Sequence, residues 1–317
     1  MRRIRLLRNY PRLRKSLQYL FLFVLLVFST GCAYNLYATH KMEKEIKKYP
    51  RDPQTGVVKG TEAITLEGDG PNAALLVHGF VGSRIDFNDL GEVLNEQGLT
   101  VRLTRLPGHG TFAVQHAVTT ADQLIEAVRT EYLAMKQDYD QVALVGFSMG
   151  GALSSIVASE EQVDRLVLIA PYFGVTYRWY YIIPAEVTNA LFGWWIPYVV
   201  KGERFTCVNR KEAKKELFCY KVLSTQGADE LIRIGEMARD PELLSRIQCP
   251  VLMLQSRNDR AASPDRSEEA FDLIGSRDKQ VIWYEESNHH ILWDYDREDA
   301  KRRIVEFLKP LFPRTQI

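Results

Sequence analysis

The sequence predicts an α/β fold in which a mostly parallel β-sheet is covered by helices on both faces. Short apolar runs typical of buried strands alternate with stretches in which apolar residues recur at helical spacing. Consecutive parallel strands need crossover helices, and these pack on the two faces of the sheet. The candidate strands are 73–79, 100–106, 141–146, 164–170, 250–256 and 280–285, and the clearest helices are 86–97, 120–137, 264–274 and 297–309.

Residues 1–32 are predicted to be a targeting segment, either a lipoprotein signal peptide or an uncleaved membrane anchor. Seven Lys or Arg residues and no acidic residue occur within the first 15 positions, and an apolar run follows at 19–28. Its ten residues are fewer than the roughly 20 that cross a bilayer comfortably. Ser-Thr-Gly-Cys at 29–32 resembles the lipobox of bacterial lipoproteins, in which cleavage precedes a lipid-modified cysteine, here Cys32; Ser29 stands where leucine is commoner. Both interpretations place the folded part in the bacterial cell envelope, membrane-anchored and facing the periplasm or the exterior.

The rest of the chain divides into a predicted tether at 33–62 and a folded domain at 63–317. The tether is rich in charge and contains Pro50 and Pro53, which interrupt regular structure. After residue 32 the chain holds 34 basic and 40 acidic residues. Binding to phosphates requires a basic patch, so no nucleic-acid partner is expected.

Cysteine spacing excludes the common metal motifs and permits at most one disulfide. With Cys32 modified, three cysteines remain, Cys207, Cys219 and Cys249. Cys207 with Cys219 is the favoured pair, and three buried thiols are the alternative. The sequence contains no C-x-x-C or H-E-x-x-H spacing, so neither a metal site nor a cofactor is predicted.

The strand at 141–146 ends in Gly-Phe-Ser-Met-Gly-Gly, which matches the motif G-x-S-x-G around Ser148. The motif indicates a nucleophile only where a strand precedes it and a helix follows it, because the serine must sit on a tight turn with small neighbours. Both conditions hold here, since an apolar run precedes the motif and a helical pattern follows it. We therefore predict that Ser148 is a nucleophile.

A nucleophilic serine needs a histidine base and an acid that orients this base. In folds with this turn, the acid and then the histidine follow the serine along the chain. Of the six histidines only His289 and His290 follow Ser148, and both lie just past the last predicted strand. His109, in the loop before the serine, is expected to be a packing residue near the site.

The acid is expected in the loop after the strand at 250–256. Asp259 is the first candidate, because a carboxylate just beyond the strand end can lie beside the base; Asp265, Glu268 and Glu269 are the alternatives. The first apolar strand ends in His-Gly-Phe, where the amide of Phe80 is predicted to supply half of an oxyanion hole. The amide of Met149, directly after the nucleophile, is predicted to supply the other half.

These segments resemble the bacterial carboxylesterase and monoacylglycerol-lipase branch of the α/β-hydrolase family, grouped with serine aminopeptidase-like hydrolases. The resemblance covers residues 72–310 and rests on the segments LLVHGFVGS, RLPGHGT, VGFSMGGAL, CPVLMLQSRNDRAASPD and WYEESNHHILWD. The last segment in that family reads Ser-Gly-His with an Asp five residues after the His, and aligning Ser287 and Asp294 places the catalytic imidazole on His289. Asn288 replaces the glycine, and asparagine also tolerates positive φ. Because neighbours on an extended loop point in opposite directions, only one of the two histidines is expected to enter the site.

The resemblance also implies a small helical cap, which we place at 171–249, where the strand–helix alternation is interrupted. Its first part is unusually aromatic and includes Trp194 and Trp195. These side chains are expected to form the core of the cap, to line an acyl-binding groove, or to contact the membrane surface, where Trp and Tyr are favoured.

Together these observations predict a membrane-tethered serine hydrolase that cleaves carboxylic esters, with short to medium acyl esters or monoacylglycerols as substrates. The alternatives are a peptidase or amidase of the same fold, which the fold and triad do not exclude, and a non-catalytic binding protein of the envelope.

Overall fold

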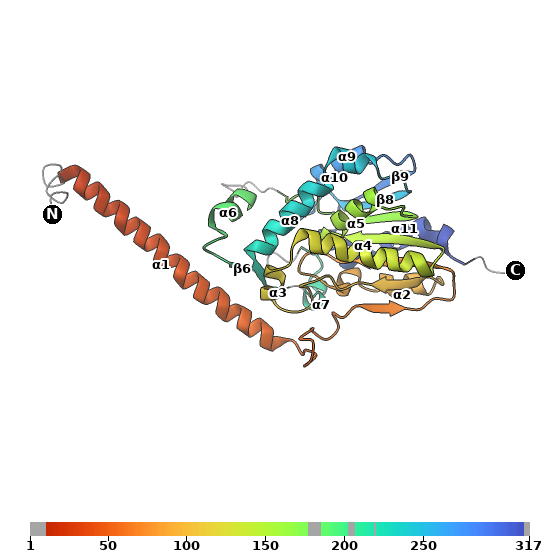
Figure 1. The fold of residues 1–317 in the computed structure, drawn as a ribbon, viewed down its shortest axis with the longest axis horizontal. Coiled ribbons are helices and arrows are strands. Elements are labelled where there is room, and N and C mark those ends of the chain that lie inside the picture. The colour runs from red at the N-terminus through yellow and green to blue at the C-terminus, as the bar shows by residue number, and fades with distance from the viewer. Residues whose placement is uncertain (1–10, 177–184, 202–206, 219, 314–317) are drawn as a thin grey trace.

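The computed structural model describes residues 11–176, 185–201, 207–218 and 220–313, and it contains a central parallel sheet with helices on both faces (Figure 1). Seven strands form this sheet in the order β1-β3-β2-β4-β5-β8-β9. All neighbouring strands are parallel except β1, which pairs antiparallel with β3. The strands are β1 (Ile64–Leu66), β2 (Asn72–Val77), β3 (Thr100–Leu103), β4 (Gln141–Phe147), β5 (Arg165–Ile169), β8 (Val251–Ser256) and β9 (Lys279–Tyr284).

All six strands predicted from the apolar runs are confirmed, and the short edge strand β1 was missed. Three of the predicted helices are found within a residue of their expected ends, as α4 (Ala121–Asp138), α10 (Pro264–Leu273) and α11 (Arg297–Leu308). The stretch at 86–97 is a shorter helix, α2 (Leu90–Asn95), preceded by a turn of 3-10 helix at Arg84–Phe87. Helix α5 (Met149–Glu160) directly follows Ser148, and the short helix α3 (Ala113–Ala117) lies between β3 and α4.

Two buried apolar layers hold the sheet between its helices. Along β4 the side chains alternate, so that Val142 and Leu144 join the layer under α4, α5 and α10, whereas Val145 and Phe147 join the layer under α2 and α11. Every residue of β2 and β8 is buried, as expected for strands covered on both faces. This packing fixes the carboxyl ends of the strands, where loops carry the polar residues of the site.

The region predicted to be a cap combines helices with a small separate sheet. It contains α6 (Ala185–Phe192), β6 (Tyr198–Val200), α7 (Ala213–Glu216), β7 (Val222–Ser224), α8 (Thr225–Ala238) and α9 (Pro241–Ser245). Strands β6 and β7 pair antiparallel. The C-terminal part of α8 packs against α5 and belongs to the main core, so the cap proper consists of α6, β6, β7 and the start of α8.

A single long helix, α1 (Pro11–Lys48), precedes the domain, and its N-terminal part extends beyond it (Figure 1). The ten-residue apolar run at 19–28 is therefore only part of a longer helix, and the first 16 residues of the predicted tether (33–48) continue it. Among the described residues α1 is the one helix long and apolar enough to cross a membrane, and a signal sequence passes the same criterion. The remainder of the predicted tether is a loop that includes a bridge between Arg51 and Val58.

Candidate active site

Ser148 stands at the junction between β4 and α5 in a strained backbone conformation. Its φ is 52° and its ψ is −118°, outside the regions that side chains normally adopt. The strain is held by surrounding hydrogen bonds, since the Ser148 amide donates to the Ile169 carbonyl at 2.9 Å and the Ser148 carbonyl accepts from Gly151 and Tyr172. This turn presents the serine side chain at the carboxyl edge of the sheet.

Two glycines of the motif are required by the closeness of neighbouring backbone. A Cβ on Gly150 would collide with the carbonyl oxygen of Val77 on β2, and a Cβ on Gly146 would collide with the backbone of Gly150. Any larger residue at either position would force β2, β4 and α5 apart. The motif therefore reflects packing around the turn, which in turn sets the position of Ser148.

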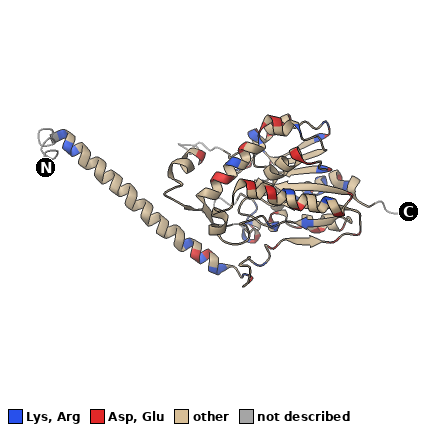
Figure 2. Ribbon diagram, viewed as in Figure 1, with Lys and Arg blue, Asp and Glu red and all other residues tan. Residues whose placement is uncertain are grey.

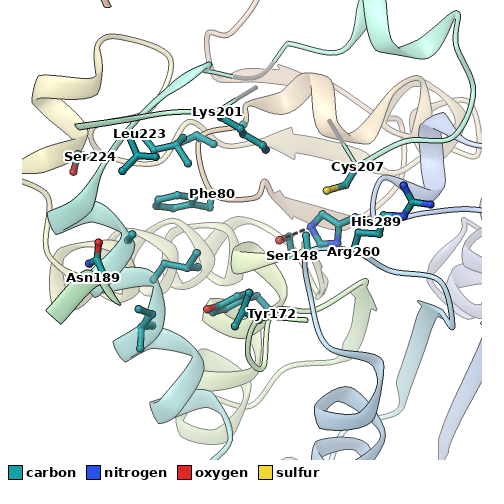
Figure 3. A pocket seen from close by; sticks show the side chains of 18 of the residues that line it. Phe80, Ser148, Tyr172, Asn189, Lys201, Cys207, Leu223, Ser224, Arg260 and His289 are labelled. Carbon is teal, nitrogen blue, oxygen red and sulfur yellow. Dashed lines mark hydrogen bonds between the residues drawn. The ribbon is translucent and has the colours of Figure 1, made fainter. Parts of the chain in front are cut away.

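The structure brings Ser148, His289 and Asp259 together in one hydrogen-bonded chain. Nε2 of His289 lies 2.9 Å from Oγ of Ser148, and Nδ1 of His289 lies 2.8 Å from Oδ2 of Asp259 (Figure 3 shows the Ser148–His289 bond). All three side chains are buried, although Ser148 and His289 border a cavity. They come from the loops after β4, β8 and β9.

The loop that carries Asp259 is fixed by hydrogen bonds to the carboxylate. Oδ1 of Asp259 accepts from the amides of Ala261 at 2.7 Å and Ala262 at 2.9 Å, which leaves Oδ2 for His289. The alternatives Asp265, Glu268 and Glu269 all lie on α10, and the carboxylate of Glu268 pairs with Arg257. Asp259 is the acid that contacts the histidine.

Asn288 joins the acid loop to the histidine loop, a role that the sequence did not indicate. Its Oδ1 accepts hydrogen bonds from the amide of Arg260 at 3.0 Å and from the amide of His289 at 2.9 Å. Its Nδ2 donates to Oδ1 of Asn209 in the cap region at 3.2 Å. Asn288 does not adopt a positive φ, so conformational freedom does not explain the asparagine. The hydrogen bonds of the Asn288 side chain explain the asparagine, because they connect the two loops that orient the imidazole.

Both histidines of the pair border the cavity, so the expectation that only one enters the site is wrong. The chain is not extended here: His290 has φ −82° and ψ 69° and leads directly into a 3-10 turn. The His290 ring packs 5.4 Å from the His289 ring and 5.0 Å from the Phe147 ring. Burial, and then the neighbouring His289 and Lys201, lower the pKa of His290 well below its usual value, so this ring is neutral.

The two amides predicted for the oxyanion hole are available for a ligand. Met149 is the first residue of α5, where the amide has no partner within the helix. Within the described part of the chain neither this amide nor that of Phe80 donates a hydrogen bond. Phe80 lies in a tight turn closed by Gly82 N–H to Gly79 O, and a Cβ on Gly79 would lie 3.1 Å from Cβ of Ser148. The turn therefore passes directly beside the serine.

Asp86 stabilises this turn by accepting a hydrogen bond from its backbone, a role that the sequence did not indicate. Its Oδ2 accepts from the amide of Gly79 at 3.0 Å, whereas its Oδ1 is buried and has no hydrogen-bond partner among the described residues. Burial raises the pKa of Asp86 to about 7, although the Gly79 amide and the charge of Lys201 act in the opposite direction. Asp86 is thus a buried carboxyl that positions the loop carrying Phe80.

Three further histidines pack together behind the turn and take no part in the hydrogen-bonded chain. The His109 ring lies between those of His78 and His116, at 5.1 and 4.9 Å, and its Nδ1 lies 2.9 Å from the Pro107 carbonyl. Burial lowers the pKa values to about 3 for His78 and His116 and to about 4 for His109. They are therefore neutral packing residues, as expected for His109.

A cavity of about 400 Å³ extends from the serine into the cap. Ser148, His289 and Arg260 lie at one end, and Asn189 and Ser224 lie at the other, beyond Phe80 (Figure 3). Its walls are mostly apolar, and the cap side is lined by Val199, Val200, Leu223, Ala228, Leu231 and Ile232. This size and lining are typical of sites for small apolar ligands.

Three predicted features stand apart from this cavity or outside the described residues. Trp194 and Trp195 do not line it and instead face α1. Cys32 lies exposed on α1. Cys219 lies outside the described residues, so the proposed pairing with Cys207 is not addressed. Within the described residues no cluster of His, Cys, Asp or Glu has the arrangement of a metal site.

The sheet, the strained serine turn and the cap define an α/β-hydrolase of the serine hydrolase class. The chain belongs to the serine aminopeptidase S33 family, whose model matches residues 71–296. It is 31% identical over 254 residues to a thermostable monoacylglycerol lipase of Bacillus sp. strain H-257, a match that covers 80% of this chain and 96% of the relative. It is 26% identical over 251 residues to a carboxylesterase of Bacillus subtilis strain 168, with 78% and 96% covered.

Solved structures agree with this assignment. A structure described under LipS and LipT, two metagenome-derived lipolytic enzymes, matches with a TM-score of 0.72 and 27% identity, and the match covers 80% of this chain and 99% of the other. The protein is therefore an enzyme of the carboxylesterase and lipase type. α1 lies outside the family match, which begins at residue 71.

Proposed function

We propose that the protein is a membrane-tethered esterase that uses Ser148, His289 and Asp259 as a catalytic triad and acts through an acyl-enzyme. The observation that carries the proposal is the continuous chain from Ser148 Oγ through His289 to Asp259, with distances of 2.9 and 2.8 Å. These distances are in the range that proton transfer requires. The strained turn and the small residues around it expose the hydroxyl to a bound ester.

In this mechanism Nε2 of His289 takes the serine proton while Oγ attacks the ester carbonyl. Nδ1–H of His289 donates to Asp259, which holds the imidazole in the productive tautomer and stabilises its positive charge. The amides of Phe80 and Met149 bind the oxyanion of the tetrahedral intermediate. His289 then protonates the leaving alcohol, and a water molecule activated by the same imidazole hydrolyses the acyl-enzyme.

The substrates that fit the cavity best are esters with one acyl chain, including monoacylglycerols. The apolar cap walls favour an acyl chain, because each buried methylene contributes about 0.8 kcal/mol, or roughly fourfold in affinity. Activity should therefore rise from acetyl esters to chains of about six to ten carbons, until the cavity is filled. Triacylglycerols and peptide amides are expected to be much slower. The Bacillus relatives named as a monoacylglycerol lipase and a carboxylesterase support this proposal.

The tether is proposed to be the N-terminal segment, held in the membrane either as an intact helix or by lipid on Cys32. The exposed apolar surface of α1 supports the first form, and the Ser-Thr-Gly-Cys sequence supports the second. In the first form the basic residues at the start of the chain favour an orientation with the N-terminus in the cytoplasm. In the second form cleavage removes these residues, and lipid holds Cys32 on the side of the membrane to which the chain is exported. The folded domain then faces the periplasm or the exterior.

Covalent labelling tests the proposed nucleophile. The detergent-solubilised full chain should react with a fluorophosphonate at Ser148 and hydrolyse p-nitrophenyl esters, and Ser148→Ala should remove both activities. A wild-type protein with neither labelling nor turnover would instead support the binding-protein alternative. Faster cleavage of an aminoacyl amide than of any ester would favour the peptidase alternative.

The neighbouring histidines provide a matched comparison for the base. His289→Ala should reduce turnover to the residual level of about 10³ to 10⁴ over water that the oxyanion hole and substrate binding supply. His290→Ala should retain labelling and most turnover, because His290 contacts neither Ser148 nor Asp259 through a hydrogen bond. The opposite result would assign the base to His290.

A further inference from the structure

We propose that the outer edge of the cap lies within the membrane leaflet next to the folded domain, so that a single-chain lipid ester reaches the catalytic cavity from the bilayer. This cap edge consists of Val187, Leu191, Phe192, Trp194 and Trp195. The inference rests on the proposed esterase function and on α1 as the tether, and it adds the membrane as the surface from which substrate is taken.

The first support is the surface of α1. No Asp, Glu, Lys or Arg occurs between Lys15 and Lys41, and charged residues lie only towards the two ends of the helix (Figure 2). All residues from Tyr19 to Phe28 are exposed, and only 6% of the most apolar window is buried. A helix that is apolar on every side is stable when it is surrounded by hydrocarbon.

The second support is that α1 is packed against the cap by specific contacts. The Phe28 ring stacks on the Trp195 ring at 5.8 Å with an interplanar angle of 9°, and a Cβ on Gly31 would overlap the same indole. Nδ2 of Asn35 donates to the Trp195 carbonyl at 2.9 Å. The hydroxyl of Tyr34 accepts from the Val200 amide at 3.0 Å. These contacts fix the position of the cap along the axis of α1, beside residues 28–35.

The position of Phe28 along α1 gives the depth of the cap edge. A hydrocarbon core of about 30 Å takes up about 20 helical residues at 1.5 Å each. If the core begins next to Lys15, it ends near Asn35. Phe28, seven residues earlier, then lies about 10 Å below the surface of the core, and Trp195 lies beside it. This depth is comparable to that of helices that lie in one leaflet, about 5 to 10 Å.

The third support is the composition and exposure of the cap edge itself. Val187 and Leu191 are four residues apart on α6, so they lie on one face, and their exposed fractions are 44% and 54%. Trp194 is 83% exposed. No charged residue occurs between Glu186 and Lys201. An exposed apolar patch of this kind that continues from a candidate membrane span is best covered by lipid.

Helix α6 contributes to both the cap edge and the wall of the catalytic cavity. Glu186 and Asn189 line the cavity, whereas Leu191 and Phe192 line a groove against Phe23, Val24, Val27 and Phe28 of α1. The far end of the cavity, marked by Asn189 in Figure 3, therefore lies one helix diameter from this groove. Among the described elements, α6 therefore lies between an acyl chain in the leaflet and the cavity that contains Ser148.

Cleavage before Cys32 would remove Phe28 and Gly31 with their contacts to Trp195, but other contacts between α1 and the cap region come from later residues. Tyr34 and Asn35 follow Cys32, and so does Glu45, whose carboxylate accepts from the amides of Lys221 at 2.7 Å and Val222 at 3.2 Å. Cleavage before Cys32 would leave these contacts intact and would attach lipid three residues before Asn35. The cap edge would then meet the surface of the same leaflet.

The test compares two substrates for the full chain in phosphatidylcholine and phosphatidylglycerol vesicles. One is p-nitrophenyl butyrate in the water, and the other is a long-chain monoacylglycerol within the bilayer. Leu191→Gln with Trp194→Gln should reduce turnover of the bilayer substrate at least tenfold and change turnover of the soluble ester less than twofold. Leu133→Gln with Leu273→Gln, which alters exposed leucines on α4 and α10, is the control and should change neither rate.

Each outcome bears on the inference separately from the proposed function. Loss of both activities in the wild type would refute the esterase, whereas equal activity of both double variants on the bilayer substrate would overturn the membrane placement. Bromine on the lipid chains provides an independent measurement, because it quenches a nearby indole. Trp194→Phe should remove a large part of the quenching. Unchanged quenching, or a cap edge covered by a second copy of the chain, would also overturn the inference.

Discussion

Replacing Asn288 with alanine should weaken both the stability and the activity of the enzyme, because one side chain connects the loops that carry Asp259 and His289. Asn288→Ala removes the acceptor for the Arg260 and His289 amides, and the second of these bonds is buried. A lost hydrogen bond costs about 1 kcal/mol, and a buried amide left without a partner costs up to about 3 kcal/mol. We therefore expect the free energy of unfolding to fall by roughly 2 to 4 kcal/mol.

The effect on activity should exceed that of a general loss of stability. Nδ1 of His289 is hydrogen-bonded to Asp259 and Nε2 is hydrogen-bonded to Ser148, so a shift of the His289 loop affects both bonds at once. A misplacement of about 1 Å can cost about 100-fold in rate. We expect kcat/KM for a p-nitrophenyl ester to fall by about 10- to 100-fold at a temperature where the variant is folded.

Asn209→Ala is the matched control, because it removes the bond from Asn288 Nδ2 without touching the amides of Arg260 and His289. The assays are urea unfolding and ester turnover across temperature for wild type and both variants. The reasoning would be refuted by an Asn288→Ala variant with wild-type stability and kcat/KM. It would also be refuted if Asn209→Ala reproduced the whole effect, because the interloop bonds would then be unimportant.

Three further predictions follow from buried or constrained residues. Asp86 has a folded-state pKa of about 7, above its usual 3.8, so its contribution to stability is present below about pH 4 and is lost as the pH rises to about 7. A pKa shift of about 3 units corresponds to about 4 kcal/mol of stability. Asp86→Asn keeps an acceptor for the Gly79 amide and should flatten the pH dependence of the unfolding free energy in urea. An identical slope in both proteins would contradict the raised pKa of Asp86. Gly150→Ala should abolish folding or reduce turnover more than tenfold because its Cβ meets the backbone of β2. Ser154→Ala on the same helix removes a hydroxyl that has no hydrogen-bond partner in the described part of the chain, and it should be neutral in thermal unfolding and ester assays. Cys32→Ser should block lipid labelling and signal-peptide processing if the lipobox is used, and equal processing of both forms would contradict it.

Much of the fold could be predicted from the sequence because the signals are local. The apolar runs that became β2, β4 and β8 are continuous since these strands are buried on both faces, and G-x-S-x-G marks the turn between β4 and α5. The closeness of Gly150 to β2 could not be predicted from the motif. The short strands β1, β6 and β7 were missed because three residues carry too little pattern to be distinguished from a loop.

The candidate site was partly accessible for the same reason. Chain order and strand ends restricted the base to His289 or His290 and favoured Asp259 for the acid. The hydrogen bond between Ser148 and His289, however, joins residues 141 positions apart, and no local pattern encodes such a distance. The geometry of the loop after β9 brought both histidines to the cavity, contrary to the simple alternation of an extended chain.

By itself the sequence determined the strand and helix pattern, the strained serine turn and the small set of acid and base candidates, because each depends on residues close together in the chain. Only the tertiary structure decided which side chains meet: Asn288 between two loops, Asp86 under the Gly79 amide, and Trp195 against Phe28 of α1. These contacts depend on where separate elements pack. Their side chains are ordinary polar or apolar residues in the sequence, and they acquire a role only when burial removes water and leaves each with one specific neighbour.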